Sequence, residues 1–206
     1  MESCNVQLLI ERGLTTQVQR RLTTMATQYF LFTALINQTA VNAISSALVD
    51  TVNDQTITDI YLGLATGGGG VTEGIALHNL IRAHPKPITI HGLGNIDSIG
   101  IVVMLAAKTR FAVPTSRFFF HPLGFDTGNS IRFDTASLSA KLDALTSDQN
   151  RLRAIYKAGT RINDVELNEL FAHEYMHDNT WATQRGFITA ERDFLIPPLS
   201  RIRNLS

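Results

Sequence analysis

Residues 59–70 read Asp-Ile-Tyr-Leu-Gly-Leu-Ala-Thr-Gly-Gly-Gly-Gly, and this stretch decides the fold class. Its first half, Asp59–Leu64, has the alternating pattern of a β-strand. The glycines that follow permit backbone conformations that other residues avoid. Behind them, Leu77, Leu80 and Ile81 have the spacing of a helix. A strand that turns through glycines into a helix is typical of an α/β protein.

The same alternation of strand and helix extends on both sides of this stretch. Further strands are predicted at Tyr29–Phe32, Ile88–Ile90, Arg110–Val113 and Phe118–Phe120. Helices are predicted at Ala40–Val52, Ser98–Ala107, Thr135–Ala158 and Asp164–His177, with a turn at Gly92–Asn95. Strands that alternate with helices favour an α/β domain with parallel strand pairs.

The chain of 206 residues is long enough for one substantial domain and short for two. Residues 1–28 are polar and are expected to form an N-terminal arm or a short helix. Residues 29–206 are expected to form the single domain. Hydrophobic residues make up 44% of the whole chain, a fraction typical of a globular protein with a real core.

Eighteen basic residues balance eighteen acidic ones, which disfavours nucleic acid and anionic membranes as partners. The longest apolar run, Ile99–Ala107, is much shorter than the roughly 20 residues of a membrane span. Cys4 is the single cysteine, so neither a disulfide framework nor a cysteine metal site is expected. The first residues lack the pattern of a secretory signal. We therefore expect a cytoplasmic protein without a cofactor.

The glycine run at residues 67–70 is a candidate anion site. Glycines at a strand-to-helix junction leave backbone N–H groups free, and such groups stabilise a phosphate or the oxyanion of acyl transfer. The pattern alone is weak, because a flexible turn has the same composition. It is not a Walker A loop, since no Gly-Lys-Ser/Thr follows.

Two further segments carry candidate catalytic side chains. Gly94–Gly100 reads Gly-Asn-Ile-Asp-Ser-Ile-Gly, which places Ser98 between a strand and an apolar helix, where a nucleophile is favourably positioned. Taken alone, Asp97 or Ser98 is more simply a helix cap. Phe118–Pro122 ends in His121 and Pro122, and a histidine at the end of an apolar strand is usually structural.

Together, these segments resemble the proteolytic subunit of Clp protease over about Tyr29 to Ile188. Asp59–Leu62 and the glycines look like the family's D-I-Y-L-x-I-N-S-P-G-G, and Gly94–Gly100 like its G-x-x-A-S-M-G. Arg110–Arg117 followed by His121–Gly124 is similar to R-F-x-L-P-N-S-R and H-Q-P-L-G. The last match is specific and raises the weight of the other two.

The resemblance implies a Clp/crotonase-type repeated ββα fold and a serine endopeptidase. Ser98 would be the nucleophile and His121 its general base. The backbone N–H groups of Gly68 or Gly69, and of Ile99, would form the oxyanion hole. The substrate would be unfolded proteins or peptides, which the strand edge near Gly69–Val71 and a hairpin at residues 125–131 would bind by β-addition.

The resemblance also implies an assembly. In the family, a projecting handle helix, here Thr135–Ala158, interlocks two rings of seven subunits into a chamber. A ring-shaped homo-oligomer and an AAA+ ATPase unfoldase partner are therefore expected, although no segment of this chain has an ATP-binding pattern.

The chain departs from the family pattern at three places near the site. Thr66-Gly67 replaces Ser-Pro, and Pro122 stands where the family has Gln. Asp97 stands where the family has a small residue. A carboxylate that pointed inward beside the nucleophile would disfavour an oxyanion, so we expect Asp97 to cap the following helix and point away.

The third member of the triad is also changed. Counting back from Arg185–Ile188, which resembles the family's E-Y-G-L-I/V, puts Glu174 at the position of the catalytic aspartate. Glutamate can orient a catalytic histidine. Asp178 is the competing candidate, but it needs a gap in the comparison.

Three other functions remain open. His173-Glu174-Tyr175-Met176-His177 fits H-E-x-x-H, in which two histidines on one helix bind zinc; Glu191 or Asp193 would have to be the third ligand. A ring-forming scaffold with an impaired triad is the main alternative without enzymatic activity. A crotonase-like acyl-CoA enzyme would share the fold without needing Ser98 and His121.

Overall fold

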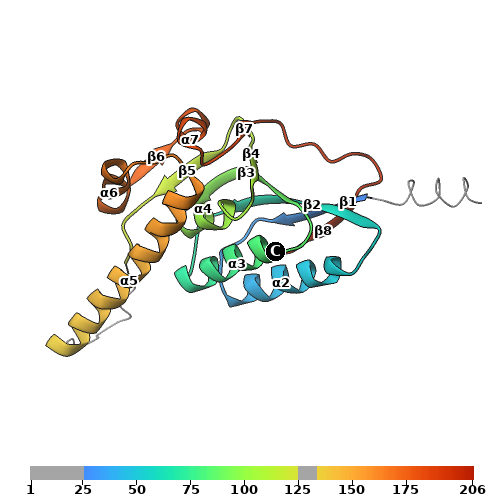
Figure 1. Ribbon diagram of the computed structural model, residues 1–206. Helices are drawn as coiled ribbons and strands as arrows, with labels where there is room; N and C mark the ends of the chain where they lie inside the picture. The colour runs from blue at the N-terminus through green and yellow to red at the C-terminus, as the bar shows by residue number, and fades with distance from the viewer. Residues whose placement is uncertain (1–25, 125–133) are drawn as a thin grey trace, which may run out of the picture.

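The computed structural model of the chain describes residues 26–124 and 134–206. Its centre is a sheet of eight strands in which the path β6-β5-β3-β2-β1-β8 is continuous, while β4 pairs with β3 and with β7 (Figure 1). The strands are β1 (Ala26–Phe32), β2 (Ile57–Thr66), β3 (Ile88–Asp97), β4 (Thr109–Ala112), β5 (Arg117–Phe120), β6 (Tyr175–His177), β7 (Ala190–Glu191) and β8 (Arg201–Asn204). The helices are α2 (Gln38–Val52), α3 (Val71–Ala83), α4 (Ile99–Met104), α5 (Thr135–Gly159), α6 (Asp164–Ala172) and α7 (Asn179–Arg185).

Helices α2 and α3 connect consecutive parallel strands, β1 to β2 and β2 to β3, and lie together on one face of the sheet (Figure 1). Helix α2 begins where the Asn37 side chain accepts a hydrogen bond from the backbone N–H of Ala40, at 2.9 Å. Its apolar face, which includes Ile44 and Leu48, is buried. These connections give an α/β fold with parallel strand pairs, as the sequence predicts.

Strand β3 overturns the turn predicted at Gly92–Asn95, because the chain stays extended to Asp97. Its first half pairs with β4, and its last three residues pair with β5. Against β2 the pairing jumps from Leu64↔Gly92 to Thr66↔Ile96, so Ala65 alone faces three residues of β3. The two glycines that suggested a turn therefore lie at a bulge, which interrupts the ladder without ending the strand.

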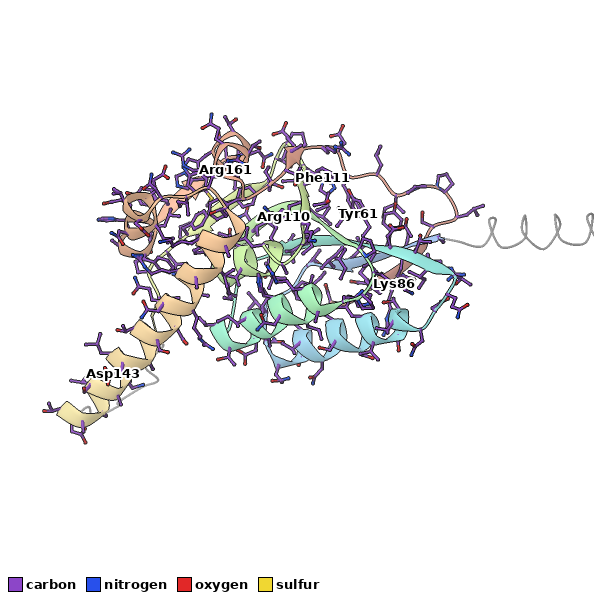
Figure 2. The ribbon with its side chains drawn as sticks, in the orientation of Figure 1. Tyr61, Lys86, Arg110, Phe111, Asp143 and Arg161 are labelled. Atoms are coloured by element: carbon purple, nitrogen blue, oxygen red, sulfur yellow. The ribbon has the colours of Figure 1, made fainter. Side chains whose placement is uncertain are left out.

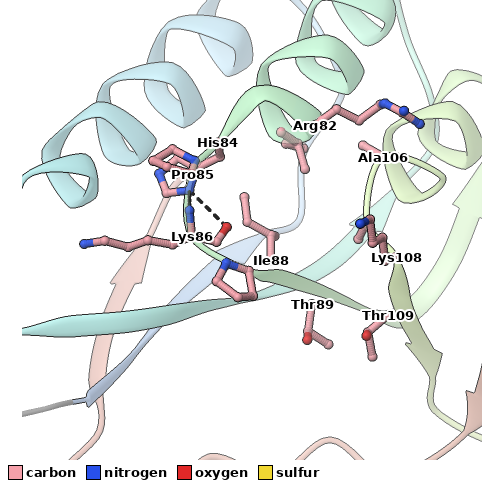
Figure 3. A pocket seen from close by; sticks show the side chains of 12 residues that line it. Arg82, His84, Pro85, Lys86, Ile88, Thr89, Ala106, Lys108 and Thr109 are labelled. Carbon is pink, nitrogen blue, oxygen red and sulfur yellow. Dashed lines mark hydrogen bonds between the residues drawn. The ribbon is translucent and has the colours of Figure 1, made fainter.

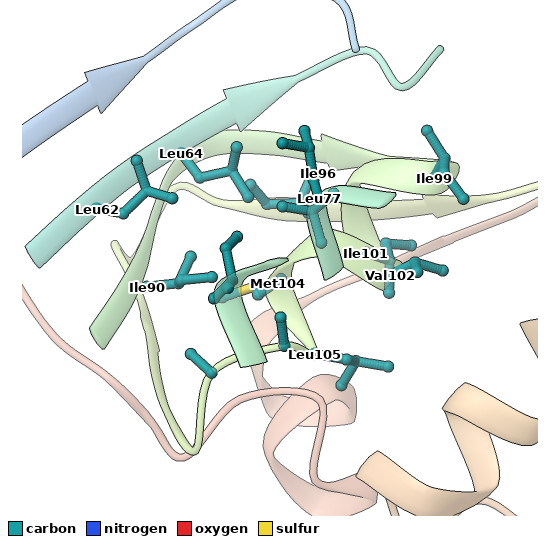
Figure 4. Close-up of a cluster of buried hydrophobic side chains, with 14 of the residues drawn as sticks. Leu62, Leu64, Leu77, Ile90, Ile96, Ile99, Ile101, Val102, Met104 and Leu105 are labelled. Atoms are coloured by element: carbon teal, nitrogen blue, oxygen red, sulfur yellow. The ribbon is translucent and has the colours of Figure 1, made fainter. Parts of the chain in front are cut away.

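Helix α4 is buried on all sides and forms the middle of the core (Figure 4). It packs against α3 so closely that a Cβ at Gly74 would come within 2.1 Å of the Ile99 side chain. A Cβ at Gly100 would come within 2.3 Å of Thr66. The sequence predicts this helix over Ser98–Ala107, but it spans only Ile99–Met104. Its tight packing fixes the position of the residue that precedes it, Ser98.

Helix α5 projects away from the body (Figure 1), as expected for Thr135–Ala158. It begins with a capping box between Asp134 and Ser137. Leu152 and Tyr156, near its end, are buried against the core, whereas Leu138 and Leu142 near its start are 49% and 64% exposed. The helix is thus anchored at one end only.

Two predicted boundaries are wrong. Strand β1 begins at Ala26, inside the predicted arm 1–28, of which residues 1–25 lie outside the described part. The helix predicted over Asp164–His177 ends at Ala172, where His173 is the C-cap, and the chain then forms β6. Strand β6 pairs antiparallel with β5, and this non-local pairing prevails over the helical preference of the segment.

The C-terminal segment returns to the sheet and adds β8 next to β1, a strand that the sequence analysis did not predict. Arg201 and Arg203 form ion pairs with Asp54 and Asp50, near the end of α2. On the way, Phe194 packs edge-on against His91, with ring centroids 5.2 Å apart. The tail is therefore held both by pairing and by an aromatic contact.

Arg110 joins three parts of the chain that are distant in sequence (Figure 2). Its guanidinium donates hydrogen bonds to the carbonyl oxygens of Ala107, Gly159, Phe187 and Gly186, at 2.5, 3.1, 2.8 and 2.7 Å. Burial lowers the pKa of this guanidinium from its usual value. A planar fork of donors suits this task, because four carbonyl groups are satisfied by one side chain.

Two buried histidines make the stability of the fold sensitive to acid. Burial lowers the pKa of both His78 and His91. His78 Nδ1 donates to the carbonyl oxygen of Val102 at 2.7 Å, and His91 bridges the Tyr61 hydroxyl and the Arg192 carbonyl. In the unfolded chain histidine titrates near pH 6.5, so the unfolded state binds more protons below that pH.

We therefore expect the free energy of unfolding, measured with urea, to be unchanged above about pH 7 and to fall as the pH is lowered to 5.5. The loss is at most about 1.4 kcal/mol for each buried histidine. His91→Gln keeps a side chain that can donate and accept, and it should reduce the pH-dependent part of the loss. An identical loss in this variant would contradict the assignment to His91.

Within residues 26–124 and 134–206, no helix has the length and apolar character needed to cross a membrane.

Candidate active site

Ser98 occupies a strained turn between β3 and α4. Its φ of 54° and ψ of −124° are unusual for a residue with a side chain, and Leu199 is the one other non-glycine residue with positive φ in the described ranges. The Ser98 N–H donates to the Phe119 carbonyl oxygen at 2.8 Å, which ties the turn to β5. Its side chain caps no backbone group of α4. A strained serine without a capping function at a helix start is the geometry of an exposed nucleophile.

The glycine segment after β2 lies directly against this serine. Gly68 has a φ of +91°, and a Cβ on it would come within 2.7 Å of the Ser98 Cβ, so only glycine fits there. The Gly68 N–H is already engaged, because it donates to the Thr66 hydroxyl at 3.1 Å. The neighbouring Gly69 N–H has no acceptor among the residues that the structure describes. Of the two predicted glycine donors, Gly69 is therefore the one left free.

The segment is fixed in place by Ile36. The Ile36 N–H donates to the Gly68 carbonyl at 2.8 Å, and the Gly70 N–H donates to the Ile36 carbonyl at 2.9 Å. A Cβ on Gly69, whose φ is +148°, would lie 2.0 Å from that carbonyl oxygen.

Ile99 is the first residue of α4, so its N–H has no partner within the helix. Two free amides, those of Gly69 and Ile99, thus belong to the segments that meet at Ser98.

His121 follows β5 directly and lines a small cavity of about 20 Å³ together with Ser98. The other walls are apolar or aromatic side chains of the body, α5 and α6: Val71, Ile99, Phe120, Leu123, Leu152, Tyr156, Leu170 and Phe171. The sequence-predicted nucleophile and base are therefore brought to one place. No hydrogen bond joins them in the described part of the chain.

The hydrogen bond that His121 does make assigns its tautomer. Nδ1 lies 2.8 Å from the carbonyl oxygen of Pro122, which can only accept, so Nδ1 carries the proton. Nε2 of the neutral ring is then an acceptor, as a general base requires. The Phe119 ring stacks on the imidazole at 5.6 Å between centroids. The Pro122 carbonyl thus fixes the tautomer of the His121 ring.

The two carboxylates predicted as the triad acid, Glu174 and Asp178, both lie away from a hydrogen bond to His121 in the described part of the chain. Glu174 is exposed and makes no hydrogen bond or ion pair within the described residues. It directly precedes β6, whose pairing Phe120↔Tyr175 would bring it opposite His121 if the ladder continued by one residue. The Asp178 carboxylate caps α7 by accepting from the Trp181 N–H at 2.9 Å. Neither is bonded to His121.

Asp97 is not the helix cap that the sequence predicted. It is the last residue of β3, and Ser98 occupies the cap position of α4. Its Oδ1 is buried without a hydrogen-bond partner. Burial raises the pKa of the Asp97 carboxyl, and the Asn95 side chain, the Phe119 backbone and His121 offset part of this effect. The expectation was wrong because the strand pairing with β5 extends one residue further than the sequence indicates.

The zinc interpretation of His173-Glu174-Tyr175-Met176-His177 is wrong on geometry. The motif requires both histidines on one helical face, one turn apart. Here α6 ends before His173, whose backbone is extended, and His177 lies in the short strand β6, so the two histidines do not share a helical face. His173 pairs with Glu169, and His177 stacks flat on Trp181, with ring centroids 3.8 Å apart. Nor do the residues described contain a cluster of three potential metal ligands.

A wider hollow of about 460 Å³ lies elsewhere, where β3 and β4 begin (Figure 3). Arg82 and Lys108 line it, and Thr89 and Thr109 lie beside each other on the paired strands. None of the predicted catalytic residues reaches it. The hairpin predicted at residues 125–131 as a peptide-binding element lies outside the described residues.

A family model described as Clp protease matches residues 14–190 of this chain. The chain belongs to the Clp protease family. Among its curated relatives is an ATP-dependent Clp protease proteolytic subunit 2 of Treponema pallidum (strain Nichols), 27% identical over 133 residues, which are 63% of this chain and 64% of that protein. The match thus spans just under two thirds of that relative.

A second relative of the same name, from Mycolicibacterium paratuberculosis (strain ATCC BAA-968 / K-10), is 26% identical over 160 residues. These are 76% of this chain and 77% of that protein. Among solved structures, a mutant of ClpP1 from Listeria monocytogenes superposes with a TM-score of 0.69 over 88% of this chain and 96% of that one. Their identity is 18%, so this likeness shows the Clp protease fold alone.

Sequence reasoning missed three parts of this Clp-type site. Thr66, whose hydroxyl occupies the Gly68 N–H, was noted only as a departure from the family pattern. Ile36, which fixes the glycine segment, carries no local signal because its pairing is non-local. The Pro122 carbonyl could not be assigned from sequence, since any residue at that position supplies one.

Proposed function

We propose that this Clp protease family member is a serine endopeptidase with Ser98 as nucleophile and His121 as general base. The observation that carries the proposal is the strained Ser98 turn, which is closed by Gly68 and opens on the cavity that His121 also lines. The Ser98 side chain makes no capping hydrogen bond to α4, so helix capping does not account for the strain.

The chemistry follows from the free groups of the site. His121 Nε2 takes the proton of the Ser98 hydroxyl while Oγ bonds to the carbonyl carbon of the peptide. The N–H groups of Gly69 and Ile99 stabilise the resulting oxyanion; one such donor typically contributes about a hundredfold or more in rate. The tetrahedral species expels the amine, which receives the proton from Nε2. Water then attacks the ester carbonyl while Nε2 takes one of its protons, and His121 gives that proton to Ser98 Oγ as the carboxylic acid leaves.

We further propose that the substrates are unfolded proteins or peptides and that the subunits enclose them in a ring-shaped homo-oligomer. The exposed Leu138 and Leu142 on the projecting α5 support self-association, because an apolar face on a helix anchored at one end needs cover. An AAA+ ATPase partner and a cytoplasmic location stay predictions that rest on the family and on the lone Cys4.

The test is covalent labelling with a fluorophosphonate probe, followed by peptide mapping. We expect one modified residue, Ser98, and the same extent of labelling with and without a chelator. Cleavage of a fluorogenic peptide should be lost in proportion to the labelled fraction. An unlabelled Ser98 in a folded, assembled protein without peptidase activity would overturn the proposal and support the ring-forming scaffold instead.

A further inference from the structure

We propose that Asp97 is a positioning residue that acts through His121: its carboxylate, rather than that of Glu174, stabilises the protonated imidazole. This inference rests on the proposed function, in which His121 receives the proton of Ser98. It gives a task to a carboxylate that stands where the family has a small residue.

Strand pairing puts the two side chains on the same side of the sheet. Asp97 is in register with Phe119 on the neighbouring parallel strand, and His121 follows Phe119 by two residues. Side chains two apart share a face. The Phe119 ring confirms this arrangement, because it stacks on the His121 ring. The preceding pair, Ile96 and Phe118, points to the other face and is fully buried in the core.

The Asp97 carboxyl has an oxygen that nothing else satisfies. Oδ1 is buried and has no donor within the described residues. Leaving such an acceptor unpaired is unfavourable, and more so when the group is charged. A protonated imidazole on the same face would compensate this cost. The carboxylate thus gains a charge partner when His121 receives a proton, and not before.

Other charges are less well placed for the same task. Across the cavity, α5 and α6 present Leu152, Tyr156, Leu170 and Phe171, none of which is ionised at neutral pH. On the β6 side, Glu174 is exposed and forms no ion pair with any residue of 26–124 or 134–206, and its chain neighbours are His173 and Tyr175. A solvated carboxylate is screened by water and salt, whereas a buried one acts through a medium of lower dielectric constant.

The mechanism needs only one addition. The Nδ1–H of His121 stays bonded to the Pro122 carbonyl throughout, and Nε2 takes the proton of Ser98. The imidazolium that forms is stabilised through space by the Asp97 charge. No proton passes to Asp97, as none passes to the aspartate of a Ser-His-Asp triad.

The test measures the protonation of His121 itself. Diethyl pyrocarbonate modifies neutral imidazole, and trypsin releases residues 118–132, in which His121 is the one histidine. Modification of this peptide over a range of pH gives the midpoint at which His121 loses its proton. Asp97→Asn and Asp97→Ala remove the charge, and alanine restores the small side chain typical of the family. Glu174→Gln is the matched control.

We expect both Asp97 variants to move the midpoint to lower pH, so that the ratio of protonated to neutral imidazole at a given pH falls by about tenfold, and Glu174→Gln to leave the midpoint in place. The pH dependence of fluorophosphonate labelling at Ser98 should shift in the same direction. A midpoint that moves in Glu174→Gln and not in the Asp97 variants would overturn the proposal. Because the modification needs no enzymatic activity, a shifted midpoint without any Ser98 labelling would reject the peptidase function and keep the Asp97–His121 interaction.

Discussion

Ser98→Ala, His121→Ala and the double variant should retain the same residual peptidase activity, at least about a thousandfold below that of the unsubstituted protein. The reason is that the two residues act on one proton. Without Ser98, His121 has no hydroxyl proton to accept, and without His121, the Ser98 hydroxyl is not activated. The second substitution therefore causes no further loss of activity. Hydrolysis of a fluorogenic peptide, compared at equal concentrations of assembled protein, gives the three values.

His173→Ala is the matched histidine control, since His173 is exposed and belongs to the rejected zinc motif. It should leave the activity unchanged. Ser98→Ala keeps the Cβ and hence the strain of the φ of 54°, so its stability should be that of the unsubstituted protein. Additive losses in the double variant would mean that Ser98 and His121 act independently, which the proposed mechanism does not allow.

Arg110→Met should destabilise the protein by about 4 kcal/mol, among the largest effects expected of one substitution. Methionine fills part of the space but donates no hydrogen bond. The carbonyl groups of Ala107, Gly159, Gly186 and Phe187 then lose their donor, and those that water does not reach become unsatisfied acceptors. Urea unfolding followed by fluorescence of the single tryptophan gives the free energy.

Arg161→Met is the control for the chemistry of the substitution. Arg161 also donates to backbone carbonyls, those of Thr183 and Gln184, but it is exposed, so water can replace it. We expect a loss of about 1 kcal/mol or less. Equal losses in the two variants would show that the buried position of Arg110 contributes nothing. Arg110→Lys should recover only part of the stability, because one ammonium group cannot reach four carbonyls.

Local sequence patterns were sufficient to predict those helices and strands whose apolar periodicity agrees with the strand pairing in the structure. Helix α2, α3 and α5 and strands β1, β2, β4 and β5 all lie where the sequence places them, with small shifts at their ends. The strand–glycine–helix order also fixed the fold class, since a parallel pair needs a helix to connect its strands. Ser98 and His121 could be selected because their segments match family motifs, not because of their own spacing.

The failures share one cause. Strand β3 passes through Gly92 and Gly94, β6 replaces the end of a predicted helix, and β8 follows two prolines; each forms because another strand pairs with it. Non-local pairing cannot be read from a window of ten residues. The helical H-E-x-x-H motif and the capping function of Asp97 were wrong for this same reason.

The amino-acid sequence by itself determined the class of fold, the family and the residues able to serve as nucleophile and base, because these depend on residue type and local order. Only the tertiary structure decided that Gly69 rather than Gly68 keeps a free N–H, that the Pro122 carbonyl accepts from His121 Nδ1, and that the Asp97 Oδ1 is buried without a hydrogen-bond partner in the described part of the chain. Those three facts depend on which strand lies beside which, and hence on the free energy of the whole sheet rather than of any one segment.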